Sequence, residues 1–368
     1  MDMIFIEDCC EILDSMRIPI TAANRKEGKY PYYGANGIQD YVADYIFDDE
    51  LVLLAEDGGN FGSKERPIAY RVSGKCWINN HAHVLRAKAG LDIDYLCYSL
   101  MFYKVDGMVN GATRQKLTQA AMRKMKIPFR SMEEQLRIVD KLNRIVKIKE
   151  QRQKELKLLD NLIKARFVEM FGDMYLNSKG WSEAKLESMA DVVSGITKGR
   201  KTKSEDLIEV PYMAVSNVKD GYIDWTTVKT IEATQQEIEQ YRLLADDVLM
   251  TEGGDPDKVG RGAIIKEPLE NCIHQNHIFR VRLDESVMLP EFFAEYLQHQ
   301  RSKRYFLGCA KQTTGIASIN MTQLRALPVL MPPLSKQEEF VLFKVQVDKS
   351  KVAILKNYLQ GGVLSYVN

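Results

Sequence analysis

The sequence contains an internal repeat whose period is about half the length of the chain. When the chain is shifted by 196 positions, residues 52–86 align with residues 248–282 without a gap. The matches include polar identities as well as apolar ones, and chance explains polar identities at a single shift poorly. They pair Glu56, Cys76, Asn80 and His81 with Glu252, Cys272, Asn276 and His277. A period this long far exceeds that of a solenoid repeat, so it predicts two copies of one whole domain.

The best shift grows along the chain. Near the N-terminus it is 180, which aligns residues 11–13 with residues 191–193. After the matched block it is 202, which aligns Leu117-Thr118 with Ile319-Asn320. The second copy therefore carries insertions in two places. Connections tolerate insertions and often carry function, so we expect two similar scaffolds whose different loops perform two different recognitions.

Composition excludes several classes of protein. The chain has 51 Lys and Arg against 50 Asp and Glu, a formal net charge of +1, which argues against a nonspecific polycation but leaves room for local basic patches. It has no apolar run of about 18 residues and no N-terminal pattern of a signal peptide, so we expect no membrane span. The six cysteines show no CxxC spacing, which favours a reducing cytoplasm. Cys76 and Cys272, at equivalent positions, are expected to be buried small side chains.

The hydrophobic pattern divides the chain into four segments. Residues 1–131 and 173–333 are strand-rich around turn-rich centres. Residues 132–172 show apolar side chains at helical spacing, with neither Gly nor Pro before Gly172. Such a helix would be about 60 Å long and would act as a spacer. A shorter helix is predicted within 334–368, after the prolines at 332 and 333. The predicted fold class is α+β, with two repeated strand-rich domains separated by two long helices that pack as an antiparallel coiled coil. The alternative for either helix is an ordinary surface helix.

Two local predictions follow from residue type. Residues 30–34 and Asn36-Gly37 combine Tyr, Pro, Asn and Gly, which is typical of turns. Residues 92–104 indicate a short helix.

No set of residues forms a persuasive catalytic centre. Residues 195–202 resemble a phosphate-binding loop, but an Arg intervenes and the spacing fails. A zinc site at His81 and His83 would need further ligands, and none is obvious. A histidine beside asparagine in each copy is more typical of a hydrogen-bonding or structural group. We therefore expect no metal and no enzymatic activity in this chain.

Several loops instead pair cations with Gly, Thr, Asn or Gln. Lys and Arg neutralise phosphates, while Arg, Asn and Gln can also read base edges in the major groove. A single basic loop is more often solvated surface, but recurrence in both copies favours DNA recognition. The candidate contacts are Lys64, Arg66, Arg114, Lys116, Lys198, Arg200, Lys201, Lys203, Lys258, Arg261, Lys311 and Gln312. The positions that the copies share, Glu56, Asn80, His81, Glu252, Asn276 and His277, are expected to belong to the scaffold.

Together these features resemble the specificity (S) subunit of a type I restriction–modification system, over nearly the whole chain. The segments that carry the resemblance are 30–38 (YPYYGANGI), 79–86 (NNHAHVLR), 248–258 (VLMTEGGDPDK), 274–282 (HQNHIFRVR) and the junctions 127–135 and 331–337. The first junction departs from the usual Pro-Pro-Leu, because it has Arg130-Ser131-Met132 there.

The resemblance implies that each strand-rich domain recognises one half of a bipartite target in double-stranded DNA. It further implies two methyltransferase subunits, which would use S-adenosylmethionine, and motor-nuclease subunits, which would use ATP and magnesium; this chain itself would hold no cofactor. One DNA turn is about 34 Å, so a spacer of about 60 Å can separate two readers by roughly a turn. The alternative from another class is a two-headed protein-interaction scaffold built on a coiled coil. A nuclease or deaminase is disfavoured by the missing catalytic sets.

Overall fold

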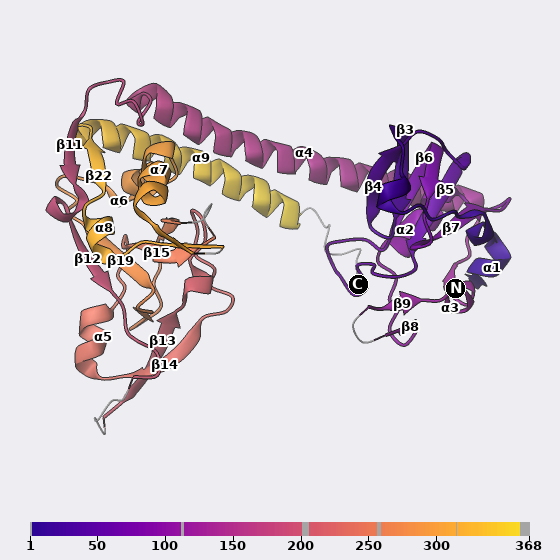
Figure 1. Ribbon diagram of the computed structural model, residues 1–368, viewed down its shortest axis with the longest axis horizontal. Helices are drawn as coiled ribbons and strands as arrows, with labels where there is room; N and C mark the ends of the chain where they lie inside the picture. Colours follow the sequence, from indigo (N-terminus) through magenta and orange to yellow (C-terminus); the bar gives the residue numbers. More distant parts are fainter. Residues whose placement is uncertain (1, 112–113, 201–205, 256–258, 314, 361–368) are drawn as a thin grey trace. The chain divides into compact units, whose positions relative to one another are not determined.

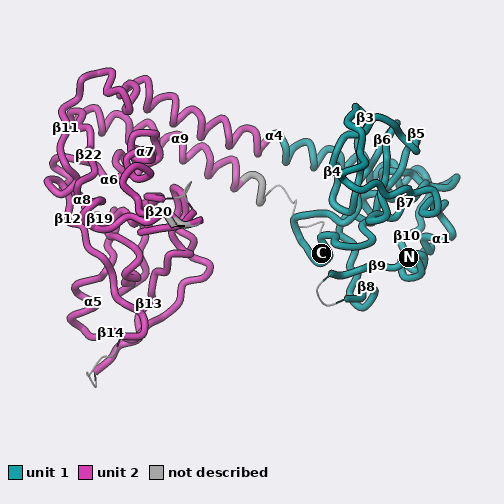
Figure 2. The backbone as a smooth tube through the Cα atoms, viewed as in Figure 1, with its two compact units in different colours: residues 1–151 teal, residues 152–368 magenta. Residues whose placement is uncertain are grey.

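The computed structural model describes residues 2–111, 114–200, 206–255, 259–313 and 315–360 (Figure 1). It divides into two compact units, residues 1–151 and 152–368, and the boundary lies inside the long helix α4 (Met132–Phe171) (Figure 2). That helix lies where the sequence predicts it. The predicted domain boundaries at residues 131, 172 and 333 lie instead at the ends of the two long helices, α4 and α9 (Leu334–Gln360).

A six-stranded sheet forms the centre of the first unit. Its order is β2-β7-β5-β6-β3-β4, antiparallel except between β3 and β6. These strands are β2 (Cys10–Ile12), β3 (Glu27–Gly34), β4 (Gly37–Val42), β5 (Phe47–Ala55), β6 (Ala69–Ile78) and β7 (Ala82–Ala87). The remaining strands pair as β1 (Met3–Phe5) with β10 (Lys126–Pro128) and β8 (Val109–Asn110) with β9 (Lys116–Leu117). The helices, besides α4, are α1 (Ile6–Cys9), α2 (Ile93–Met101) and α3 (Gln119–Arg123), with 3-10 turns at Asp14–Met16 and Ala22–Asn24.

Strand β5 supplies both faces of this sheet with core residues. Val52 and Leu54 belong to the hydrophobic cluster that includes Leu96 of α2, whereas Leu51 and Leu53 belong to a second cluster. Successive side chains of a strand point to opposite faces, so a strand buried on both faces shows a continuous apolar run. Residues 51–54 show this pattern.

The predicted turn at residues 30–34 is wrong, because these residues form the second half of β3. Tyr favours strands, and Pro31 is tolerated because the pairing of β3 with β6 covers only Tyr32 and Tyr33. The turn itself is confined to Ala35 and Asn36. The short helix predicted at 92–104 is present as α2.

The described residues of the second unit form four small sheets. Their orders are β12-β19-β15-β17, β14-β13-β18, β16-β21-β20 and β11-β22. The strands are β11 (Ser182–Lys185), β12 (Ala190–Ser194), β13 (Ile208–Met213), β14 (Lys229–Ala233), β15 (Val248–Thr251), β16 (Gly253–Gly254), β17 (Gly262–Ile264), β18 (Ile273–His274), β19 (Ile278–Leu283), β20 (Lys311–Thr313), β21 (Ile316–Ser318) and β22 (Pro328–Met331). The helices are α5 (Gln235–Tyr241), α6 (Pro290–Tyr296), α7 (Gln300–Cys309), α8 (Met321–Arg325) and α9 (Leu334–Gln360), with 3-10 turns at Leu186–Ser188 and Val215–Asn217.

Strand registers confirm the internal repeat. Glu11 pairs with Arg86 between β2 and β7, and Asp191 pairs with Arg282 between β12 and β19. The parallel pairs are equivalent too, because Tyr32 aligns with Trp77 as Tyr212 aligns with Ile273. The first insertion lies between β13 and β14, where the first copy has only the turn at 35–36. The second copy also has two helices between β19 and β20, α6 and α7, where the first copy has α2 alone between β7 and β8.

One buried glutamine joins each strand-rich region to its helix. Gln135 and Gln337 are almost fully buried, at 1% and 0% exposure. Each accepts a hydrogen bond from a backbone N–H and donates to two backbone carbonyls. The partners are Asp92, Gly90 and Arg130 for Gln135, and Leu289, Val287 and Pro332 for Gln337. Because the same bonds recur, the two domain-to-helix junctions are built alike.

The two long helices pack antiparallel within the second unit. Arg166 of α4 pairs with Glu339 of α9 at 2.9 Å, while Asp160 pairs with Lys351 at 2.7 Å. Residue numbers fall along one helix as they rise along the other, so the helices run in opposite directions, side by side in Figure 1. The predicted antiparallel pairing of the helices is therefore confirmed in this unit. Among the described residues, no helix has both the length and the apolar character needed to cross a bilayer.

His274 should make the stability of the second unit sensitive to acid. Burial lowers the pKa of its ring to about 4, although the carbonyls of Tyr241 and Val193 face its two nitrogens. The unfolded chain, with a histidine pKa near 6.5, binds this proton more readily, so stability falls as pH drops from about 6.5 towards 4. Between pH 7 and pH 5 we expect His274 to cost about 2 kcal/mol of unfolding free energy.

Denaturant unfolding at the two pH values measures this loss. The variant His274→Ile, which carries the residue found at the equivalent position 78, should show a pH dependence smaller by that amount. Equal pH dependence in the variant and the native chain would contradict the assignment.

Candidate nucleic-acid interface

Four connections of the first unit meet at one place, which we call the first loop cluster (residues 35–36, 56–58, 79–81 and 114–117). The Asn36 side-chain amide donates to the carbonyl of Gly58 at 2.9 Å, and the Gly58 N–H donates to the carbonyl of Gln115 at 3.2 Å. The backbone of Glu56 donates to His81 at 2.9 Å and accepts from Leu117 at 2.7 Å. These hydrogen bonds therefore fix the loops against one another, and loops held by a rigid scaffold are common sites of binding.

Carboxylates hold the cations of this cluster. Glu56 pairs with Arg17 at 2.6 Å through one oxygen and with Lys116 at 3.0 Å through the other. Asp57 accepts a hydrogen bond from Arg114 at 3.0 Å and contacts the Nδ1 atom of His81 at 2.6 Å. Two of the predicted cations, Arg114 and Lys116, thus lie beside two of the predicted scaffold positions, Glu56 and His81.

A buried polar network lies next to the cluster. The Nδ1 atom of His83 lies 2.7 Å from a carboxylate oxygen of Asp14, and its Nε2 atom lies 2.8 Å from the carbonyl of Leu117. Burial alone would raise the pKa of Asp14, but His83 and a hydrogen bond from Gln119 hold that pKa below its usual value. His83 and Asp14 are almost inaccessible to solvent, so the network belongs to the scaffold.

Asp14, Glu56 and His83 bring three possible metal-ligand atoms within 4.8 Å of one another, and no other group of the described residues does so. Their chemistry, however, does not fit a metal. Arg17 donates to Glu56 and lies 3.6 Å from Asp14, so a cation already neutralises this site. Both nitrogens of His83 already face oxygen atoms. We therefore describe the group as an ion-pair network.

The second unit builds an equivalent second loop cluster (residues 252–254, 275–277 and 316–319). The Glu252 N–H donates to the carbonyl of His277 at 3.0 Å, and the Glu252 carbonyl accepts from Ile319 at 2.8 Å. These bonds match those of Glu56 in the first copy. The Glu252 carboxylate also contacts the ring of His277. Recurrence of the same backbone bonds supports a scaffold role for the shared positions; Asn276 likewise donates through its N–H to Ile196.

The other candidate DNA contacts lie outside the two loop clusters or differ in exposure. In the connection between β5 and β6, Lys64 and Arg66 are exposed. In the second unit Lys198 is exposed in the loop after β12, and Lys311 is exposed at the start of β20. Arg261 is half-buried. Lys201, Lys203 and Lys258 lie outside the described residues, as does the side chain of Gln312.

Arg200 differs from the other candidates because it has a strong internal partner. Its guanidinium makes two hydrogen bonds of 2.6 Å to Glu237 at the start of α5. Glu237 also accepts from the N–H of Thr234, so it caps the helix. This bidentate pairing gives Arg200 a structural role, and a contact with DNA would have to compete with it.

The sequence pattern does not indicate two residues that pair within the first loop cluster. Asp57 accepts a hydrogen bond from Arg114, and Arg17 shares the Glu56 carboxylate with Lys116, but neither is among the predicted site residues. Asp57 could have been found, because it lies inside the matched block at a position where the second copy has Gly253. Arg17 carried no such signal, since it lies in a loop outside the matched block.

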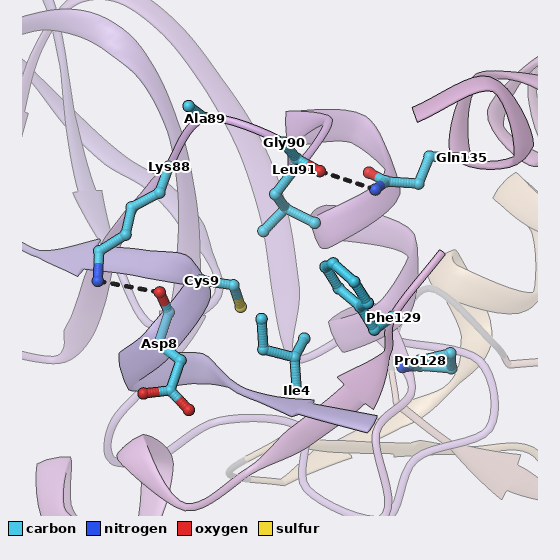
Figure 3. Close-up of a pocket in the computed structure, with 10 residues that line it drawn as sticks. All are labelled: Ile4, Asp8, Cys9, Lys88, Ala89, Gly90, Leu91, Pro128, Phe129 and Gln135. Atoms are coloured by element: carbon cyan, nitrogen blue, oxygen red, sulfur yellow. Dashed lines mark hydrogen bonds between the residues drawn. The ribbon is translucent and has the colours of Figure 1, made fainter. Parts of the chain in front are cut away.

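A cavity of about 150 Å³ lies at the junction of β1, β10 and the start of α4 in the first unit (Figure 3). Ile4, Leu91 and Phe129 line it with apolar surface. Lys88 donates to the carbonyl of Asp8 at one end, and Gln135 donates to the carbonyl of Gly90 at the other. None of the candidate contacts lines this cavity, so it is part of the domain-to-helix junction.

The chain thus has two strand-rich units, linked in sequence by a long helix, and each unit carries an equivalent loop cluster. This arrangement is typical of a protein with two related recognition domains. The family described as "Type I restriction modification DNA specificity domain" matches residues 1–158 and 178–361. The chain therefore belongs to this family. Members of the family are DNA-recognition components of type I systems and carry no catalytic function of their own. Membership favours DNA recognition over the alternative of a protein-interaction scaffold.

Named relatives agree with this assignment. A Haemophilus influenzae protein whose name places it among the type I restriction enzyme specificity subunits is 26% identical, over 91% of this chain and 84% of its own. The EcoKI specificity subunit of Escherichia coli K12 is 23% identical over 79% and 66%. The fold is similar to the crystal structure of a type I S subunit from M. genitalium, with a TM-score of 0.56 at 14% identity over 99% and 93%. A chain from a type I assembly has a TM-score of 0.55 at 15% identity over 98% and 93%.

Proposed function

We propose that this chain is the specificity subunit of a type I restriction–modification complex and that residues 1–131 and 173–333 each read one half of a bipartite target in double-stranded DNA. Residues 132–172 and 334–368 set the spacing and dock two methyltransferase subunits. Motor-nuclease subunits join for restriction. The partners supply S-adenosylmethionine, ATP and magnesium chemistry, and the complex works in the cytoplasm.

The observation that carries this proposal is the pair of equivalent loop clusters with different side chains. Glu56 and Glu252 make the same two backbone hydrogen bonds, so both copies present their loops from one frame. The residues beside them differ, as with Asp57 against Gly253 and Lys116 against Ser318. Two half-sites of different sequence need such an arrangement, because sequence is read by side chains while the frame sets position.

Lys64 and Arg66 are expected to contact phosphates. Both are exposed in the first unit and make no ion pair with another described residue. Each neutralised phosphate contributes about 0.9 to the slope of log affinity against log salt concentration. The double variant Lys64→Ala and Arg66→Ala should therefore lower affinity for every DNA sequence and reduce this slope by up to about 2.

The measurement is a salt titration of DNA binding by the chain in complex with its methyltransferase partner. A matched control is the pair Lys104→Ala and Lys124→Ala, two exposed lysines of the same unit that lie outside both the first loop cluster and the connection between β5 and β6. The control pair should leave the slope unchanged. If both pairs change the slope equally, Lys64 and Arg66 contribute no more to DNA binding than other exposed lysines of the unit. If the native complex does not bind DNA selectively, the proposed function is wrong.

A further inference from the structure

The equivalent histidines of the two copies are held by different carboxylates. His277 contacts Glu252, whereas His81 contacts Asp57, the residue after the equivalent Glu56. Glu56 instead pairs with Arg17 through one carboxylate oxygen and with Lys116 through the other. The second copy has Gly253 in place of Asp57. The first copy therefore carries a carboxylate at a loop position where the second copy has none.

That carboxylate fixes an exposed arginine. The Nη2 atom of Arg114 lies 3.0 Å from the Oδ1 atom of Asp57 and 3.4 Å from the Nδ1 atom of His81. The second copy has Ile316 at the position equivalent to Arg114. Since Asp57 and Arg114 are both replaced by uncharged residues in the second copy, they form a unit that belongs to the first copy alone.

The side chain of Arg114 lies against a glycine, Gly58. Gly58 has a φ of +61°, and a Cβ atom there would lie 3.3 Å from the Nε atom of Arg114. The guanidinium therefore rests directly against the loop backbone. Its side chain is still 60% exposed, and its Nη1 and Nε atoms donate no hydrogen bond to any described residue. Arg114 is thus anchored at one nitrogen while its other donors face solvent.

This arrangement suits a base edge better than a phosphate. A phosphate contact needs only positive charge near the backbone, and the carboxylates of Asp57 and Glu56 would repel a phosphate placed there. The planar guanidinium matches the O6 and N7 acceptors of guanine in two parallel hydrogen bonds. Holding the side chain in place beforehand reduces the entropy lost on binding.

We infer that Arg114 reads a guanine in the half-site bound by the first domain, and that Asp57 and His81 are positioning residues that orient it. The inference rests on the proposed function and specifies one of its contacts. The second domain, with Gly253 and Ile316, must read its half-site by other residues.

The test compares variants in the complex with the methyltransferase partner, with every position of the target varied in turn. The native complex should prefer guanine at one position of one half-site. Arg114→Lys keeps the charge but loses the paired hydrogen bonds, so the preference at that position should fall by roughly five- to 150-fold. The salt slope and the preferences in the other half-site should not change.

Asp57→Asn tests the positioning role, because asparagine has the same shape without the charge. It should weaken the preference at the same position, by less than Arg114→Lys does, with no change in salt slope. Lys64→Ala is the matched control, and it should lower the salt slope while leaving the guanine preference intact. Thermal melting of each variant checks that the fold is unchanged.

Two results would overturn the inference. Either Arg114→Lys leaves every base preference unaltered, or Arg114→Ala lowers binding equally for all bases and reduces the salt slope, as a phosphate contact would. If only the assignment of Arg114 is wrong, the native complex still selects bases in both half-sites. A native complex without selectivity in either half-site would instead remove the proposed function.

Discussion

Phe167→Ala lowers the unfolding free energy of the second unit by about 3–5 kcal/mol, which is the expected cost of removing a buried aromatic side chain. Phe167 lies on α4 and is fully buried. Its ring centroid lies 5.2 Å from that of Phe340 on α9, 5.4 Å from that of Phe292 on α6 and 4.1 Å from that of His299. One side chain thus joins the coiled coil to the strand-rich part of the unit, and alanine would leave a cavity between them.

Differential scanning calorimetry measures this effect. A loss of this size should lower the melting temperature of the second unit by roughly 10 °C. Leu158→Ala is the matched control on the same helix, because Leu158 is 56% exposed and its truncation should shift melting little. Equal shifts for the two variants would mean that the aromatic cluster does not hold the helices to the domain.

Asp14→Ala should destabilise the first unit by about 3–5 kcal/mol, because it removes one partner of a buried charged network. Asp14 accepts hydrogen bonds from Gln119 and from the backbone N–H of Val84, and it contacts the ring of His83. Without the carboxylate, these buried groups lose their partner and Arg17 loses part of its compensating charge.

Denaturant unfolding with a probe in the first unit measures this loss. Asp106→Ala, at an exposed aspartate of the same unit, should change stability by less than about 0.5 kcal/mol. Asp14→Asn should lie between the two, since the amide can still accept hydrogen bonds but carries no charge. A small effect of Asp14→Ala would show that the network is not needed for folding, and the loop cluster would then lack its proposed support.

Much of the fold follows from the sequence because duplication and periodicity are strong signals. Apolar spacing and the absence of Gly and Pro predict the helix that the structure shows at Met132–Phe171. The repeat alignment predicted that Cys76 and Cys272 would be equivalent and buried, and both are fully buried. The sequence predicts a turn at 30–34 because Pro31 favours one, but pairing with β4 and β6 makes this segment a strand.

The candidate site could be predicted only in part. Loops rich in cations are visible in the sequence, and Arg114 and Lys116 do lie together with Glu56 and His81. Which cations are already paired depends on contacts between distant segments. Arg200 meets Glu237 across 37 positions, and Arg17 meets Glu56 across 39 positions. No local sequence pattern indicates such pairs. The sequence alone therefore cannot distinguish an arginine that is paired within the fold from one that is exposed and available to DNA.

Sequencing of the methylated bases in a host with and without this gene tests the central claim most directly. The account predicts that the gene and its methyltransferase partner together methylate one bipartite motif with a fixed gap, and that this motif loses methylation when the gene is deleted. If the same methylated motifs remain after deletion, the chain does not specify a DNA sequence and the account is contradicted.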